Sequence, residues 1–254
     1  MKRLIASLPA IVLLAAATAL AQTKPTFSLG VRGGLNRVIT TTDPAGNQPL
    51  ASSPGPFSYS TDKTALTAWQ AGLVGEVSFG KLAIQPALLF SQKGEHVVFN
   101  ALADGITRTY SKQESTNRYN WLELPVNFVY TLNGDHGLQV LAGPYVALGV
   151  GGHQKGYTEG YLGPAVDIWP GNYTSPIKYG PNTYNHRLDI GMNFGLGYRL
   201  GPVQVQASYG LGLRNLHMPR DYSYLPISTL YHDYQADAAY NRVLQFTGTY
   251  FFKL

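Results

Sequence analysis

The sequence predicts an all-β fold, an eight-stranded antiparallel transmembrane β-barrel of the outer-membrane type. Three features support this prediction: a leader-like amino terminus, eight segments in which apolar and polar side chains alternate, and connections that alternate between short and long. The bilayer interior offers no water to backbone N–H and C=O groups. A chain that crosses it in short alternating segments must therefore close its sheet into a barrel.

The amino terminus indicates export. Lys2 and Arg3 precede an apolar run over residues 4–20, and Ala19 and Ala21 frame a small-residue cleavage site. This is the pattern of a signal peptide over residues 1–21, which leaves residues 22–254 as one barrel domain. The expected location is the outer membrane of a Gram-negative bacterium. The chain has no Cys for a lipid anchor or a disulfide, and no apolar run after the leader reaches the roughly 18 residues of a membrane helix.

Alternation with a period of two defines the spanning strands. In the fourth, Leu122, Leu124 and Phe128 fall on one face and Glu123 and Asn127 on the other, so the first face meets lipid and the second faces the lumen. The strands are expected at residues 27–38, 65–79, 82–91, 119–132, 138–150, 187–200, 203–214 and 241–252. Tight turns are expected at residues 80–81, 133–137 and 201–202. Pro86 inside the third strand predicts a bulge or a missing ladder bond.

The long connections, residues 40–64, 92–118, 151–186 and 215–240, are expected to face outward, with both termini in the periplasm. The second contains strand-like residues 96–100 and 107–110 around a turn at 103–105, which predicts that the third and fourth strands project above the membrane as a ribbon. The alternative is a ten-stranded barrel. Arg108, Lys112, Glu114 and Arg118 are too polar to meet lipid at alternate positions, so eight strands are favoured.

Several strands resemble those of PorT-like outer-membrane β-barrel proteins, also described as porin-family barrels. The similar segments are Trp-Leu-Glu-Leu-Pro-Val at 121–126, Ala-Gly-Pro-Tyr-Val at 142–146, residues 189–198, residues 209–216 and Asn-Arg-Val-Leu-Gln-Phe at 241–246. The resemblance covers most of the chain after the leader and implies the barrel scaffold. It specifies no reaction, and it implies a role in protein secretion only for some members.

Charges of both signs fall on the lumen face. An eight-stranded barrel has room inside for side chains only, so we expect a polar network that fills the lumen rather than a conducting channel. Its predicted members are Arg32, Glu76, Glu123, Asp189, Arg199 and Arg214. We expect Arg214 to pair with Glu123 or Asp189 near the outer end. Arg242 has the outward parity and is placed to meet lipid phosphates.

Enzymatic activity is not expected. His153, His186, His217 and His232 lie in the connections or at strand tops, yet they have no spacing typical of a nucleophile or a metal site. No catalytic residue, cofactor or metal is therefore predicted. The formal net charge of +5 includes Lys2 and Arg3 of the leader, so it gives no support for nucleic-acid binding.

The long connections are rich in aromatic residues, which suit recognition of a protein or glycan but equally suit packing among the connections or at the lipid interface. The candidates are Tyr157, Tyr161, Trp169, Tyr173, Tyr179, Tyr222, Tyr224 and Tyr231. The predicted function is a non-enzymatic, monomeric barrel that contacts outer-membrane lipid and lipopolysaccharide and binds an extracellular ligand. The alternatives are a small porin or secretion accessory and, third, a hydrolase at the barrel rim. The sequence does not identify a ligand or a physiological role.

Overall fold

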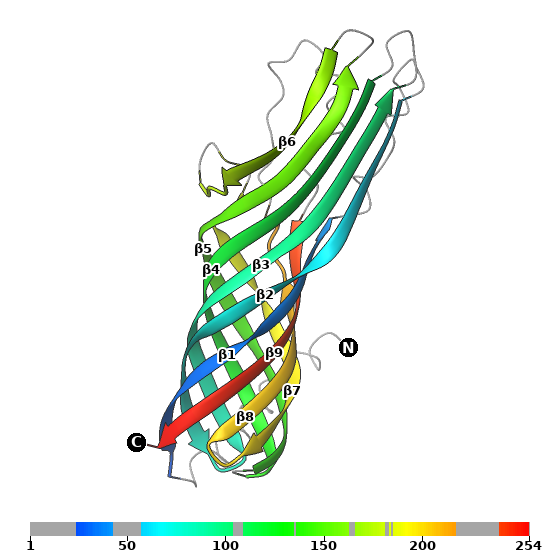
Figure 1. Ribbon diagram of the computed structural model, residues 1–254. Coiled ribbons are helices and arrows are strands. Elements are labelled where there is room, and N and C mark those ends of the chain that lie inside the picture. Colours follow the sequence, from blue (N-terminus) through cyan, green and yellow to red (C-terminus); the bar gives the residue numbers. More distant parts are fainter. Residues whose placement is uncertain are drawn as a thin grey trace, which may run out of the picture.

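A computed structural model describes residues 24–42, 57–103, 109–134, 136–162, 166–180, 183, 185–216 and 239–253. The predicted signal peptide lies outside these residues. Figure 1 shows a tilted barrel from which a sheet rises on one side. The strands are β1 (Thr26–Thr42), β2 (Phe57–Phe79), β3 (Leu82–Ala103), β4 (Thr109–Asn133), β5 (His136–Leu162), β6 (Val166–Pro176), β7 (Leu188–Leu200), β8 (Val203–Gly212) and β9 (Ala239–Lys253). No helix in the described ranges is long and apolar enough to cross a membrane.

Eight antiparallel strands close the barrel. The sheet order is β4-β3-β2-β1-β9-β8-β7-β5-β6, and β4 also pairs with β5, so the ring closes and β6 alone stands outside it. Each predicted spanning segment overlaps one strand of this ring, which confirms the eight-stranded barrel. The first and last strands pair from Ser28 opposite Lys253 to Thr42 opposite Ala239, so the start of β1 and the end of β9 lie together at the end that carries the short turns.

The side chains alternate as predicted. The outward Leu35, Phe128 and Leu196 are 57%, 54% and 63% exposed, whereas the inward Gln85 and Asp189 are fully buried. Such a continuous belt of exposed apolar side chains is stable only where lipid covers it. The short turns also agree, because Gly80 and Gly201 adopt positive φ angles of 66° and 57° there.

β5 changes its partner halfway along. Its first half pairs with β7 from Gly137 to Leu148, and its second half pairs with β6 from His153 to Leu162. The register of β4 against β5 shifts between Asn120 and Trp121, and that of β2 against β3 shifts between Ala65 and Gln70. Because bulges bend a strand and increase its twist, they explain why the sheet leaves the barrel at this height.

The described parts of the first three predicted long connections are largely strand rather than loop, whereas residues 217–238 of the fourth lie outside the described residues. Residues 57–65 of β2, 92–103 of β3, 109–120 of β4 and 151–162 of β5, together with β6, form one antiparallel sheet, which we call the protruding sheet. The expected two-stranded ribbon is therefore one part of a five-stranded structure, visible in Figure 1. Strands that lie in water can carry polar side chains on both faces. The alternation of apolar and polar residues therefore ends at the edge of the lipid, although the strands continue to pair by hydrogen bonds beyond it.

Pro86 interrupts a ladder without shifting it. Pairing between β2 and β3 runs to Val74 opposite Ala87 and resumes at Val77 opposite Ile84 in the same register. Proline lacks an N–H for the ladder. Of the two outcomes predicted for Pro86, the missing ladder bond is therefore the one that occurs.

Candidate functional site: the lumen and the protruding sheet

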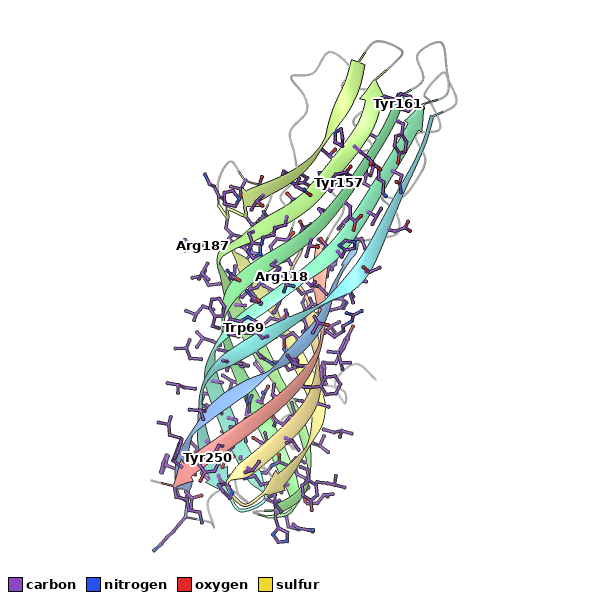
Figure 2. All side chains as sticks on the ribbon, viewed as in Figure 1. Trp69, Arg118, Tyr157, Tyr161, Arg187 and Tyr250 are labelled. Carbon is purple, nitrogen blue, oxygen red and sulfur yellow. The ribbon has the colours of Figure 1, made fainter. Side chains whose placement is uncertain are left out.

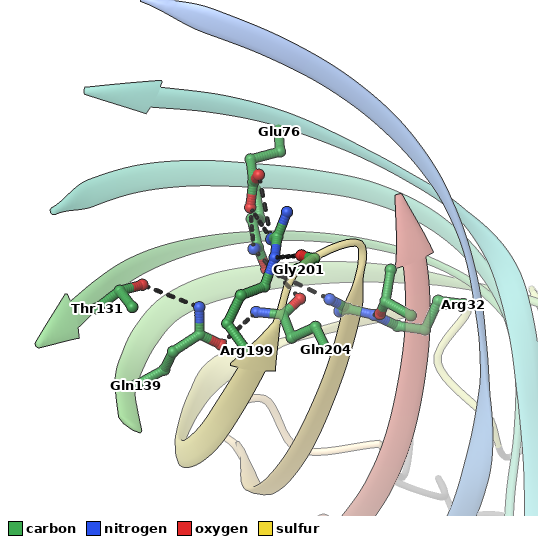
Figure 3. A network of polar contacts seen from close by, with 9 residues as sticks. Arg32, Glu76, Thr131, Gln139, Arg199, Gly201 and Gln204 are labelled. Atoms are coloured by element: carbon green, nitrogen blue, oxygen red, sulfur yellow. Dashed lines mark hydrogen bonds and ion pairs between the residues drawn. The ribbon is translucent and has the colours of Figure 1, made fainter. Parts of the chain in front are cut away.

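A chain of hydrogen bonds crosses the lumen near the short turns. Gln85 lies at its centre: it donates to Glu76 Oε2 at 2.7 Å and to Gln204 Oε1 at 3.3 Å, and it accepts from Arg32 Nη2 at 3.4 Å. Gln204 in turn donates to Gln139 Oε1 at 2.6 Å. Figure 3 shows how the side chains of Arg32, Glu76, Gln139 and Gln204 converge from the barrel wall.

Every strand of the ring contributes to this chain. Arg32 also donates to Thr249, Gln139 donates to Thr131, and Arg199 Nη1 lies 2.9 Å from Glu76 Oε2. We call the set the basal network; its members are Arg32 (β1), Glu76 (β2), Gln85 (β3), Thr131 (β4), Gln139 (β5), Arg199 (β7), Gln204 (β8) and Thr249 (β9). Because the members bond in series across the lumen, the network both fills the barrel and ties its wall together.

A vestibule lies between the basal network and the turns. Its volume is about 750 Å³, and Glu76, Gln139 and Arg199 form part of its wall. The guanidinium of Arg199 packs over the Phe251 ring, with 4.3 Å from its Cζ to the ring centroid. The vestibule therefore ends on a layer of bonded and packed side chains.

A second buried cluster lies nearer the protruding sheet. Lys93 Nζ is 3.0 Å from Glu123 Oε2 and 3.4 Å from Asp189 Oδ2, and all three side chains are at most 1% exposed. Asp189 Oδ2 also accepts from Asn241 Nδ2 at 2.8 Å and from the Tyr145 hydroxyl at 3.2 Å. We call these five residues the Lys93 cluster. Its lysine also lies over the Tyr145 ring, 4.7 Å from the centroid, which adds a cation–π contact.

Aromatic side chains cover the Lys93 cluster. Trp121 is 2% exposed, and Tyr179 packs edge-on against it at 5.4 Å between ring centroids. Gly149 makes this contact possible, because a Cβ atom there would lie 2.6 Å from the Tyr179 ring. Trp121 and Tyr179, with Tyr119, Leu216 and Ala239, form what we call the aromatic cap.

The predicted lumen residues divide into two levels. Arg32, Glu76 and Arg199 meet in the basal network, and Glu123 and Asp189 meet in the Lys93 cluster. The expectation for Arg214 needs correction. Arg214 lies past Gly212, where β8 ends, and is only half-buried. Its charge lowers the pKa of His186. The cation that meets both carboxylates is Lys93.

Lys93 was missed because the third strand was expected to end at Ser91. The inward parity of Gln85, Ser91, Lys93 and Glu95 continues without a break, and all four are buried. Following this alternation past the apolar segment would have placed Lys93 in the lumen. Glu95, two residues beyond Lys93, is buried, which raises the pKa of its carboxyl, although Lys63 at 3.7 Å opposes the rise.

The protruding sheet carries paired polar side chains. Across β4 and β5, Lys112 lies 4.0 Å from Glu159, and the Tyr110 and Tyr161 rings lie 5.9 Å apart. On the opposite face, Gln113 Nε2 donates to the Tyr173 hydroxyl at 2.6 Å. Figure 2 shows Tyr157 halfway up this sheet and Tyr161 near its end.

The aromatic recognition candidates separate into three groups. Tyr157 and Tyr161 lie in β5 and Trp169 and Tyr173 in β6, so these four are strand residues rather than loop residues. Tyr179 turns toward the barrel and belongs to the aromatic cap. Tyr222, Tyr224 and Tyr231 lie outside the described residues. Within the part of the chain that the structure describes, no three His, Asp or Glu side chains are grouped to hold a metal ion.

Comparison with known proteins identifies the family. Residues 20–218 match the outer membrane protein beta-barrel domain. The chain is similar to the crystal structure of Neisserial surface protein A, with 10% identity and a TM-score of 0.34 over 88% of this chain and 97% of that one. It is also similar to Pseudomonas aeruginosa OpdL, with 10% identity and a TM-score of 0.13 over 91% of this chain and 99% of that one. No curated protein matches the sequence. The chain therefore belongs to the outer membrane protein beta-barrel domain family and is an outer-membrane protein.

Proposed function

We propose that this protein is a non-enzymatic, monomeric outer-membrane barrel with a closed lumen. The protruding sheet would face the outside of the cell and bind an extracellular protein or glycan. The observation that carries the first part is the presence of two buried networks in series, the basal network and the Lys93 cluster. A solute would have to displace both.

Closure follows from the size of the ring. Eight strands enclose a lumen that side chains fill. Gln85 and Gln204 are fully buried at the lower level, and Lys93 and Asp189 are at most 1% exposed at the upper level. Moving an ion through either level would break hydrogen bonds or ion pairs between buried side chains.

Planar-bilayer recording tests the closed lumen. The purified protein should give no steady unitary conductance, whereas a variant with Lys93→Ala, Gln85→Ala and Gln204→Ala should conduct if it folds. Folding is checked by heat-dependent migration in gels. A steady conductance of the parent protein, with ion selectivity that changes in Lys93→Ala, would instead support the small-porin alternative.

A role as an accessory of protein secretion is the alternative that the PorT-like resemblance implies. It uses the same protruding sheet but predicts that a secreted protein stays in the cell when the sheet is shortened. Secretion that is unaffected by this change, together with loss of binding to an external protein or glycan, would favour the recognition role.

The surroundings of His186 do not favour a role as a catalytic base. His186 lies just before β7, where burial lowers its pKa and the nearby Arg214 lowers it further. A catalytic histidine that acts as a base must become an imidazolium, which a neighbouring carboxylate stabilises and a neighbouring cation destabilises. A hydrolase assay on His186→Ala and the parent should therefore show no activity in either protein.

A further inference from the structure

Two arginines converge on one threonine on the outside of the barrel. Arg37 of β1 donates from Nη1 to the Thr67 hydroxyl at 3.2 Å, and Arg118 of β4 donates from Nη1 to the Thr67 carbonyl at 3.4 Å. Thr67 and Arg37 are exposed and Arg118 is half-buried. We propose that this arginine clamp, Arg37, Thr67 and Arg118, binds a phosphate group of a membrane lipid.

The local fold builds the clamp. The register shift between Ala65 and Gln70 places Thr67 in a bulge of β2, and bulges redirect side chains. Because β3 lies between β4 and β2, Arg118 must cross β3 to reach Thr67. It crosses at its register partner Gly94, which adds no side chain of its own, and the Leu66 side chain lies beside this glycine.

The clamp lies at the edge of the apolar belt. Two residues further down the same outward faces, Leu35 is 57% exposed and Trp69 is 46% exposed. Trp69 packs against Phe90 at 5.2 Å between ring centroids. Figure 2 shows Trp69 on the barrel just below Arg118, where the barrel passes into the protruding sheet. Tryptophan prefers this boundary between hydrocarbon and polar headgroups.

The charge near the clamp is positive. Arg242 of β9 pairs in register with Ile39, two residues from Arg37 on the same outward face. It donates to the Gly212 carbonyl at 2.7 Å and lies over the Tyr240 ring. Residues offset by two across neighbouring strands lie roughly 7–8 Å apart, so Arg242 extends the basic surface toward β9.

These features favour a phosphorylated lipid. Two guanidinium groups bonded to one residue repel each other, and an anion between them removes that repulsion. Guanidinium presents a fork of donors that matches phosphate. Because Trp69 and Phe90 lie on the lipid side of the clamp, the phosphate should belong to an amphiphile whose acyl chains cover these rings. We assign this lipid to the outer leaflet, and this assignment rests on the proposed orientation of the protruding sheet toward the outside of the cell.

Native mass spectrometry of the detergent-solubilised protein tests this inference. The probes are diphosphoryl lipid A, its dephosphorylated form and inorganic phosphate. The parent should bind the diphosphoryl lipid, and Arg37→Gln with Arg118→Gln should weaken binding by about tenfold or more because both surface cations are lost. The matched control, Lys81→Gln with Lys253→Gln, removes two exposed cations at the opposite rim and should bind like the parent.

Three outcomes would overturn the inference. They are equal binding of the dephosphorylated lipid, displacement of the lipid by an equal concentration of inorganic phosphate, and an equal loss in the control variant. Arg37→Lys with Arg118→Lys keeps the charge and the fold but removes the donor forks, so binding should fall several-fold. Unchanged affinity in both the lysine and the glutamine variants would also refute the clamp. The measurement is made in micelles, so it stands even if the orientation of the sheet proves to be reversed.

Discussion

Replacing Lys93 by methionine should strongly destabilise the barrel. The Lys93 amine faces the Glu123 and Asp189 carboxylates at 3.0 and 3.4 Å in a site that is at most 1% exposed. Methionine fills a similar volume but leaves two buried carboxylates without a cation. Breaking a buried pair by removing one partner costs roughly 3–5 kcal/mol, so we expect a loss of this size in the free energy of unfolding.

The assay is urea unfolding of the protein in lipid vesicles or detergent, followed by tryptophan fluorescence and extrapolated linearly to zero urea. Lys81→Met is the matched control, because Lys81 is exposed at the turn after β2. Adding Glu123→Gln and Asp189→Asn to Lys93→Met should restore most of the stability, because both buried charges are then gone. Glu123→Gln alone leaves one lysine and one carboxylate and should cost much less than Lys93→Met.

Two results would refute this reasoning. If Lys93→Met unfolds within about 0.5 kcal/mol of the parent, as surface substitutions usually do, the cluster is hydrated and the lumen is open at this level. If the triple variant is no more stable than Lys93→Met, the loss comes from packing in the aromatic cap rather than from the unpaired carboxylates.

Four further predictions follow from the geometry. Gln204→Leu should cost roughly 1–3 kcal/mol of unfolding free energy in the same assay, because the Gln139 amide oxygen loses the Gln204 donor and Gln85 loses one of its two acceptors. Gln206→Leu should cost less, since the Gln206 amide nitrogen has no hydrogen-bond partner among the described residues. Gly149→Val should displace the Tyr179 ring and cost roughly 1–3 kcal/mol of unfolding free energy. Gly33→Ala should be tolerated, because an added Cβ there meets no atom within 4 Å. Equal costs of the two changes would contradict this account of the aromatic cap. Replacing residues 152–178 by a short Gly-Ser turn should leave a barrel with normal heat-dependent gel migration, because β5 still pairs with β7 up to Leu148. Failure of this variant to fold would show that the protruding sheet stabilises the ring. An epitope inserted at Asn172 should be labelled on intact cells and one at Lys81 only after permeabilisation, and the reverse pattern would invert the proposed orientation.

Much of the barrel could be predicted from the sequence because lipid imposes a simple rule. Every outward side chain in the belt meets hydrocarbon, so residues such as Leu122, Leu124 and Phe128 mark their strand without reference to any other part of the chain. The predicted residues Arg32, Glu76, Glu123, Asp189 and Arg199 were found for the same reason, since parity fixes which face a side chain takes. Parity does not fix height, and Arg214 was placed beside the carboxylates although it lies past the end of β8.

The sequence by itself determined the number of spanning strands, their faces and the positions of the short turns, because each depends on local alternation and on the bilayer. The sequence also predicted the ribbon of the third and fourth strands. Only the tertiary structure decided that β2, β5 and β6 join this ribbon in the protruding sheet, since their pairing links distant segments that carry no apolar pattern. It also decided which polar groups meet. Lys93 with Asp189 and Arg118 with Thr67 join residues far apart in sequence, and their contacts depend on the register of neighbouring strands, on the bulge in β2 and on the closure of the ring.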